Sequence, residues 1–148
     1  MALFDTHTHL YLSDFDADGG GEAAVARAVE AGVEAMLMPN VDLSTIAPLR
    51  SLQERCPGRV YAAMGLHPTE VGASWRDDVA QALDAVAATD VAIGEVGMDL
   101  YWDRTFRDEQ MQALEMQALR AVELDLPLVI HCREALAETL GVLSGERG

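Results

Sequence analysis

The chain has 148 residues, of which 50% are hydrophobic, and its 25 acidic and 10 basic residues give a formal net charge of −15. A surface this acidic argues against two classes of protein that depend on basic patches: those that bind along the phosphates of a DNA duplex, and those that bind an anionic membrane. No apolar run approaches the roughly 20 residues of a membrane-spanning helix, so we expect no membrane partner. The amino terminus lacks the basic segment of a secretion signal, and the two cysteines show no CxxC spacing. We therefore expect one reduced, cytoplasmic domain over residues 1–148.

Short apolar runs alternate with helical patterns along the chain. The runs predict five strands, at Leu3–Thr6, Ala35–Pro39, Val60–Gly65, Val91–Glu95 and Leu128–His131. Helices are expected between and after them, at Glu22–Ala31, Leu43–Cys56, Arg76–Ala88, Phe106–Asp125 and Glu134–Leu143. Nearly continuous hydrophobicity is typical of strands buried on both faces of a parallel sheet. A strand begins about every 31 residues, the size of a βαβ unit. This spacing fits both an open five-stranded sheet and the first part of a (β/α)8 barrel.

Residue types at the helix ends support these boundaries. Gly32 and the pair Pro57-Gly58 are expected to stop the first two helices, and Ser74 to begin the third. Thr105 and Asp108 have capping-box spacing at the start of the longest helix.

All four histidines lie at the carboxyl ends of predicted strands. His7 and His9 follow the first strand, where alternate residues point to the same side. His67 follows the third strand, His131 ends the fifth, and the fourth ends at Glu95. Parallel α/β folds place their active sites at this edge, and a buried carboxylate is costly unless it is paired or bound to a metal. Imidazole and carboxylate donors bind Zn, Mn, Fe or Ni, so the pattern predicts a metal centre.

Four motifs together resemble the TatD family of metal-dependent hydrolases. They are Asp5-Thr6-His7-Thr8-His9-Leu10, Gly65-Leu66-His67-Pro68, Ile93-Gly94-Glu95-Val96-Gly97-Met98-Asp99 and Pro127-Leu128-Val129-Ile130-His131-Cys132-Arg133-Glu134-Ala135. The resemblance covers essentially the whole chain. It implies an α/β fold of the TIM-barrel type, a parallel (β/α) sheet truncated to about five of eight units. It also implies an enzyme that hydrolyses phosphodiester bonds at a DNA end by means of metal-activated water.

The resemblance assigns up to two divalent ions, Zn, Mn, Mg or Ni, to this site. It implies that His7 and His9 hold the first metal, that His131 binds the second, and that Glu95 bridges both as the catalytic residue. The family pattern adds a His after the sixth strand and an Asp after the eighth, and both positions lie beyond Gly148. An alternative is therefore an inactive remnant that binds one metal through His7, His9, Glu95 and His131. A half-barrel that needs a partner chain, or self-associates through open sheet edges, is a further alternative.

Three residues are candidates for substrate binding. His67 is expected to contact substrate or a phosphate oxygen, or else to satisfy a loop carbonyl. Arg133 has the planar guanidinium that grips a phosphate, or else caps its own helix. Asp99 either orients a ligand or caps the following turn.

The neighbouring residues leave the substrate open. Gly94 and Gly97 flank Glu95 and are expected to let a metal or substrate approach closely. Tyr101 and Trp102 are expected to stack on a base, or else to anchor a loop. A single-stranded DNA end and a small ester, lactone or amide are both compatible with these residues.

Overall fold

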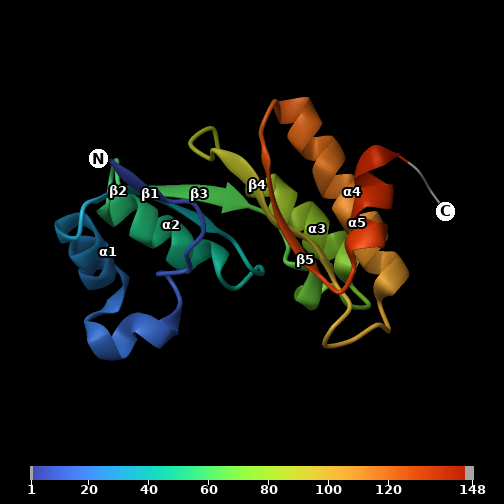
Figure 1. Ribbon diagram of the computed structural model, residues 1–148, viewed down its shortest axis with the longest axis horizontal. Coiled ribbons are helices and arrows are strands. Elements are labelled where there is room, and N and C mark those ends of the chain that lie inside the picture. Colours follow the sequence, from blue (N-terminus) through green and yellow to red (C-terminus); the bar gives the residue numbers. More distant parts are fainter. Residues whose placement is uncertain (1, 146–148) are drawn as a thin grey trace.

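The computed structural model describes residues 2–145 and shows a single parallel sheet. Its strands lie in the order β1-β2-β3-β4-β5, so each strand pairs with the next one along the chain. Their bounds are β1 Leu3–Asp5, β2 Val33–Pro39, β3 Val60–Met64, β4 Ala92–Asp99 and β5 Leu128–Arg133. A doubly wound open sheet reverses its strand order part-way, and this sheet does not. The strands form a curled half-barrel of the TIM-barrel type, with β1 and β5 at its edges (Figure 1).

The helices lie outside the strands (Figure 1). Helices α1 and α2 lie beside β1 to β3, and helices α3 to α5 lie beside β4 and β5. Their bounds are α1 Gly20–Glu30, α2 Ile46–Arg55, α3 Trp75–Asp84, α4 Arg107–Leu124 and α5 Leu136–Ser144. Two short 3-10 helices are η1, Ser13–Asp18, and η2, Pro68–Glu70. Among the described residues, no helix combines the length and hydropathy needed to span a bilayer.

The predicted elements all occur, but some of their boundaries differ. Strand β4 extends four residues past Glu95, because its second half pairs with β5, with Val96 opposite Ile130. The capping box is wrong: α4 begins at Arg107 with no capping hydrogen bond from a side chain. The amide of Thr105 instead donates to Asp103 Oδ1 at 2.8 Å, which closes the loop one turn earlier.

Glycines in β4 let it lie unusually close to β5. A Cβ atom on Gly94 would stand 2.6 Å from the Cβ of Val129. Gly97 has φ +142°, and a Cβ there would stand 1.9 Å from the carbonyl oxygen of His131. The close approach that these glycines permit is between two strands, rather than the approach of a metal or substrate expected from the sequence.

Strand β4 is the centre of the core that positions the site. All eight of its residues are buried. Ile93, Val96 and Met98 pack with Leu114 of α4 in one apolar cluster. Because the whole strand is covered, the Glu95 side chain on it is also withdrawn from solvent.

Two buried glutamines of α4 form hydrogen bonds with the backbone where β3 and β4 pass into their following loops. The side-chain amide of Gln117 accepts from the Leu66 amide at 2.8 Å and donates to the Leu66 carbonyl at 3.3 Å. The amide of Gln110 makes the same pair of contacts with Asp99, at 2.8 and 3.1 Å. The residues that precede His67 and Tyr101 are therefore fixed to one helix.

Candidate metal centre

The first group of donor atoms joins the end of β1 to the middle of β4. The Nε2 atoms of His7 and His9 lie 3.0 and 3.4 Å from Oε2 of Glu95. The two Nε2 atoms lie 3.2 Å from each other. His7 and His9 lie beyond the end of β1 at Asp5, but their side chains do point to the same side, as predicted, and with Glu95 they form a set that can hold a metal ion.

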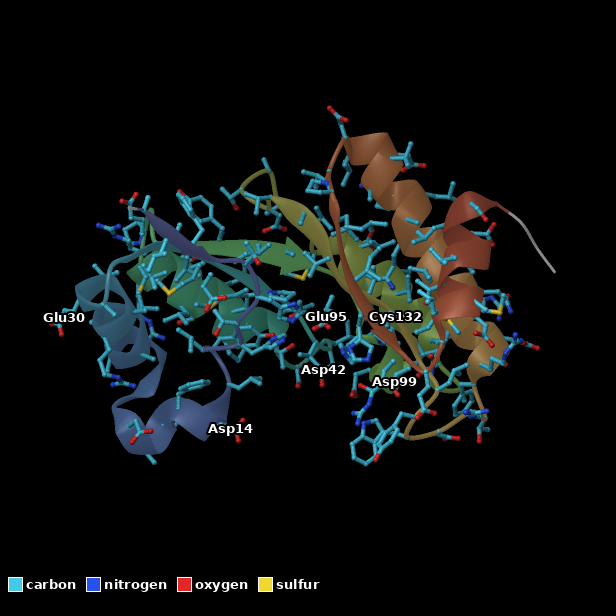
Figure 2. All side chains as sticks on the ribbon, viewed as in Figure 1. Asp14, Glu30, Asp42, Glu95, Asp99 and Cys132 are labelled. Carbon is cyan, nitrogen blue, oxygen red and sulfur yellow. The ribbon has the colours of Figure 1, made fainter. Side chains whose placement is uncertain are left out.

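A second group of donor atoms uses the other oxygen of the same carboxylate. His131 Nδ1 lies 3.2 Å and His67 Nε2 lies 3.6 Å from Oε1 of Glu95. The His67 and His131 rings are in edge contact, with centroids 4.5 Å apart. Figure 2 shows Glu95 near the middle of the molecule, with Asp99 below it and to its right. The structure thus places His67 among the metal-competent donors, where the sequence suggested a substrate contact.

The surroundings of Glu95 keep it ionised. Its exposed fraction is 5%, and this burial alone would raise its pKa. Hydrogen bonds from His131, His67 and His9 outweigh burial and hold the pKa well below its usual range. A buried carboxylate among imidazoles is a normal donor set for a divalent transition metal, so the residues present fit such an ion.

Tyr11 orients one of the imidazoles. Its hydroxyl donates to the Pro39 carbonyl at 2.5 Å and lies 2.9 Å from Nδ1 of His9. Because the hydroxyl proton is used on Pro39, Nδ1 of His9 donates to the hydroxyl oxygen, and Nε2 is the ring nitrogen that faces Glu95. Burial, together with the charges of Glu95 and Asp42, raises the pKa of Tyr11, so the hydroxyl stays protonated.

We expect the substitution Tyr11→Phe to weaken metal binding about tenfold, because it removes the hydrogen bond that sets the His9 tautomer. Isothermal titration calorimetry with Zn²⁺ or Mn²⁺ measures this change. Tyr61→Phe, which removes a hydroxyl from an exposed ring on β3, is the matched control and should bind like the wild type. Equal affinities for both variants would contradict the role of Tyr11.

Asp99 performs both tasks that the sequence left open. Its Oδ2 lies 2.8 Å from Nε2 of His131, and its Oδ1 accepts from the amides of Tyr101 and Trp102 at 3.0 and 3.4 Å. Burial raises the pKa of Asp99, but the hydrogen bonds to His131 and to these amides lower it overall. Hydrogen bonds to Glu95 raise the pKa of His131 against the effect of burial, and Asp99 adds to this rise. Asp99 therefore orients a metal-competent imidazole and also caps the turn after β4.

The family model described as TatD related DNase matches residues 4–148. This chain belongs to the TatD family.

Relatives of this TatD-family chain agree with the assignment. The Bacillus subtilis protein named uncharacterized metal-dependent hydrolase YabD is 34% identical over 145 residues, which cover 97% of this chain and 56% of YabD. A protein of Pantoea sp. named 3'-5' ssDNA/RNA exonuclease TatD is 35% identical, over 90% of this chain and 51% of its own length. The TatD-family chain thus spans about half the length of these curated relatives.

Solved structures give the same result for the fold. The crystal structure of YjjV, a TatD homologue from Escherichia coli, superimposes with a TM-score of 0.82 at 31% identity. The match covers 97% of this TatD-family chain and 56% of YjjV. A TatD-family hydrolase from Entamoeba histolytica shares the fold, with a TM-score of 0.77 at 16% identity over 97% of this chain and 54% of its own.

The remaining predicted site residue of this TatD-family chain, Arg133, lies beside the donor groups and outside them. Its guanidinium carbon is 3.7 Å from the ring centroid of Tyr101 and 5.2 Å from that of Trp102. Helix α5, which follows, has no capping hydrogen bond from a side chain, so Arg133 does not cap it. The aromatic contacts gave no signal in the sequence beyond the adjacency of Tyr101 and Trp102.

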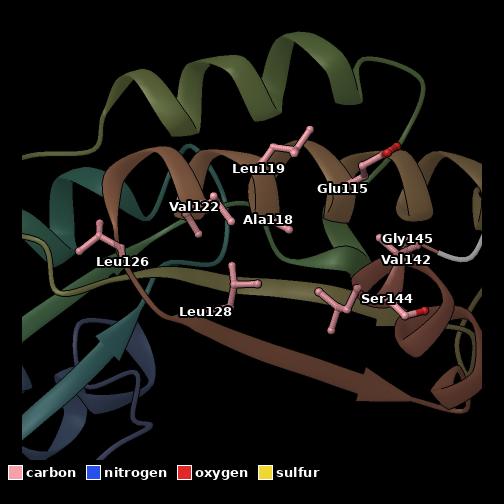
Figure 3. Close-up of a pocket in the computed structure, with 11 residues that line it drawn as sticks. Glu115, Ala118, Leu119, Val122, Leu126, Leu128, Val142, Ser144 and Gly145 are labelled. Atoms are coloured by element: carbon pink, nitrogen blue, oxygen red, sulfur yellow. The ribbon is translucent and has the colours of Figure 1, made fainter.

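A cavity of about 600 Å³ lies away from the histidines, between α4, β5 and α5 (Figure 3). Its lining is mainly aliphatic, including Leu119, Val122 and Leu128. It contains no imidazole, so it does not extend the metal centre.

Proposed function

We propose that the site of this TatD-family chain hydrolyses phosphodiester bonds at an end of single-stranded DNA or RNA. The observation that carries the proposal is one buried carboxylate, Glu95, which contacts two histidines through each of its oxygens. Divalent cations bound there would lower the pKa of a water molecule and polarise a phosphate oxygen. The name of the Pantoea relative, an exonuclease for single-stranded DNA and RNA, supports this choice of substrate.

The residues of the chain prepare the site for this chemistry. Glu95 remains a carboxylate because its histidine neighbours hold its pKa low. Tyr11 and Asp99 fix the ring nitrogens of His9 and His131, so that the opposite nitrogen of each ring faces Glu95. Imidazole donors favour Zn, Mn or Ni over Mg in such a set.

The charge of the chain supports a strand end as substrate. A formal net charge of −15 repels a long polyanion at a distance, so attraction must come from the site itself. Arg133, which follows His131 by two residues on β5, supplies a cation at this edge of the sheet. A short single-stranded end can reach that edge without laying many phosphates along an acidic surface.

The test is release of nucleotides from a single-stranded oligonucleotide with a 5′ label. The chain is supplied with Mn²⁺, Zn²⁺ or Ni²⁺, and products are separated by length on a denaturing gel. We expect stepwise shortening that EDTA abolishes, and slower shortening of a blunt duplex of the same sequence. Absence of shortening with every metal that calorimetry shows to bind would overturn the proposal. Metal-dependent hydrolysis of p-nitrophenyl acetate alone would point instead to carboxylic esters.

A further inference from the structure

Two aromatic rings stand exposed directly after β4, beside the metal centre. The exposed fractions are 49% for Tyr101 and 71% for Trp102. Their rings meet edge to face, with centroids 4.8 Å apart. Trp102 is therefore not the buried loop anchor that one reading of the sequence allowed, and one of the largest apolar side chains of the protein faces solvent.

The loop that carries these rings is tied to the second donor group. The amides of Tyr101 and Trp102 both donate to Oδ1 of Asp99, whose Oδ2 contacts His131. Gln110 holds the backbone of Asp99 from the opposite side. The loop backbone that carries the rings is thus fixed relative to the metal centre before any ligand arrives, which lowers the entropy cost of binding.

Arg133 lies beside the two rings, and its guanidinium is not paired with a carboxylate of the described residues. Its guanidinium stacks on Tyr101 and approaches Trp102. The guanidinium makes no ion pair or hydrogen bond with the other residues of 2–145, although the chain is strongly acidic. Other arginines of the described chain do pair with carboxylates, namely Arg50, Arg55, Arg104, Arg107 and Arg120. Stacking on a ring leaves the N–H groups at the guanidinium edge open to an external anion.

We propose that Tyr101, Trp102 and Arg133 form a nucleotide subsite, in which Arg133 binds a phosphate and Trp102 stacks on a base. The inference rests on the proposed function, since it concerns the substrate of the same site. Arg133 already covers Tyr101, so Trp102 offers the ring face for the base. Every base has a π face, so the subsite accepts all four bases and favours single strands, whose bases are free to stack.

The lining near Trp102 sets the direction of the bound nucleotide. A hollow of about 260 Å³ is lined in part by Trp102, Glu70 and Asp103. Asp99 also lines it, but its carboxylate is held by His131 and by the loop amides. The carboxylates of Glu70 and Asp103 repel a phosphate and can accept hydrogen bonds from the N–H groups of bases. The base therefore lies toward Trp102 and the hollow, and the phosphate lies toward Arg133 and His131.

Fluorescence titration tests the subsite directly. The probes are a trithymidylate with phosphorothioate linkages and an abasic analogue with the same backbone. Trp75, the other tryptophan, is 3% exposed, so quenching by a stacked base reports on Trp102. We expect Trp102→Ala to weaken binding of the trithymidylate about tenfold, and Trp102→Phe to retain most of it. Because calorimetry can follow binding in the variants that lack Trp102, the comparison does not depend on fluorescence alone.

The variants separate the two parts of the subsite. Arg133→Gln should weaken both probes, whereas Trp102→Ala should weaken only the probe that carries bases. Tyr61→Ala removes an exposed ring near the start of β3, at the far end of the strand from the site, and should change neither. Equal binding of the two probes to the wild type, or an unchanged affinity in Trp102→Ala, would overturn the subsite.

A second assay distinguishes failure of the subsite from failure of the proposed function. Methyl p-nitrophenyl phosphate is a phosphodiester without a nucleobase, and its metal-dependent hydrolysis reports on the donor groups. Hydrolysis of this diester together with equal binding of the two probes overturns the subsite and leaves the proposed function standing. Absence of hydrolysis together with binding that depends on Trp102 overturns the function and supports the subsite.

Discussion

The substitution Glu95→Gln is expected to lower the affinity for Mn²⁺ and Zn²⁺ by about 100-fold or more at both donor groups. One carboxylate oxygen of Glu95 faces His7 and His9, and the other faces His67 and His131. Loss of a hydrogen-bond partner behind a metal ligand costs about 10- to 100-fold in affinity, and loss of a shared ligand removes more. The substitution also replaces the only carboxylate of the two donor groups by a neutral amide, so both groups lose their electrostatic attraction for a cation. Calorimetric titration with each metal measures the effect.

The control for this variant is Glu22→Gln, the same chemical change on α1, where the carboxylate pairs with the exposed Arg55. It should bind metal like the wild type. Circular dichroism of both variants checks that the fold is retained. If Glu95→Gln binds either metal as tightly as Glu22→Gln does, Glu95 is not a shared ligand.

The second large effect is expected on stability, from Gly97→Ala. The added methyl group would lie 1.9 Å from the carbonyl oxygen of His131, and the φ of +142° is one that alanine rarely adopts. Strand β4 cannot yield easily, since it is buried along its whole length. We expect a loss of about 3 kcal/mol or more in the free energy of unfolding, measured by urea denaturation. Loss of the cooperative transition would be the extreme form of the same result.

Gly72→Ala is the matched control for the glycine variant. A Cβ atom at Gly72 would have no neighbour within 4 Å, so the change should stay within about 0.5 kcal/mol. If the two variants unfold at the same urea concentration, the close contact of β4 and β5 does not constrain residue 97.

Much of the fold follows from hydrophobic pattern alone. Strands of a parallel sheet are buried on both faces, so each is a short apolar run that stands out from the amphipathic helices around it. The carboxyl end of β4 could not be found in this way, because Gly97 interrupts the apolar run after Glu95 and Asp99 ends it with a charge. The strand continues because its second half pairs with β5. Such pairing depends on the neighbouring strand rather than on the local sequence.

The residues of the first donor group and two of the second were predictable, and so was the sharing of Glu95, but His67 was not expected as a donor. His7, His9, Glu95 and His131 could be recognised because rare residue types recur at strand ends, where parallel sheets gather side chains. The position of His67 beside His131 depends on the curvature of the sheet and on the path of the loop after β3. Neither quantity is visible in the sequence.

Other parts of the site depend on contacts between distant segments. The cation–π contact of Arg133 joins the end of β5 to the loop after β4, and only adjacency to His131 marked Arg133 as functional. The sequence did contain one unused signal, since Gln110 and Gln117 are polar residues seven apart on the helix face that packs against apolar strands. Such a pair predicts side-chain amides with buried backbone partners.

Helix α4 sets the distance between two parts of the site through its buried side chains Gln110 and Gln117. Seven residues of α-helix rise about 10.5 Å, and this length separates the anchor for Leu66 from the anchor for Asp99. The first anchor immediately precedes His67, and the second holds Asp99, two residues before Tyr101. A shift of α4 along its axis by one residue would misplace both together by about 1.5 Å, which exceeds the tolerance of metal coordination. The spacing between His67 and the segment that begins at Asp99 is thus set by a helix that contributes no residue to either donor group.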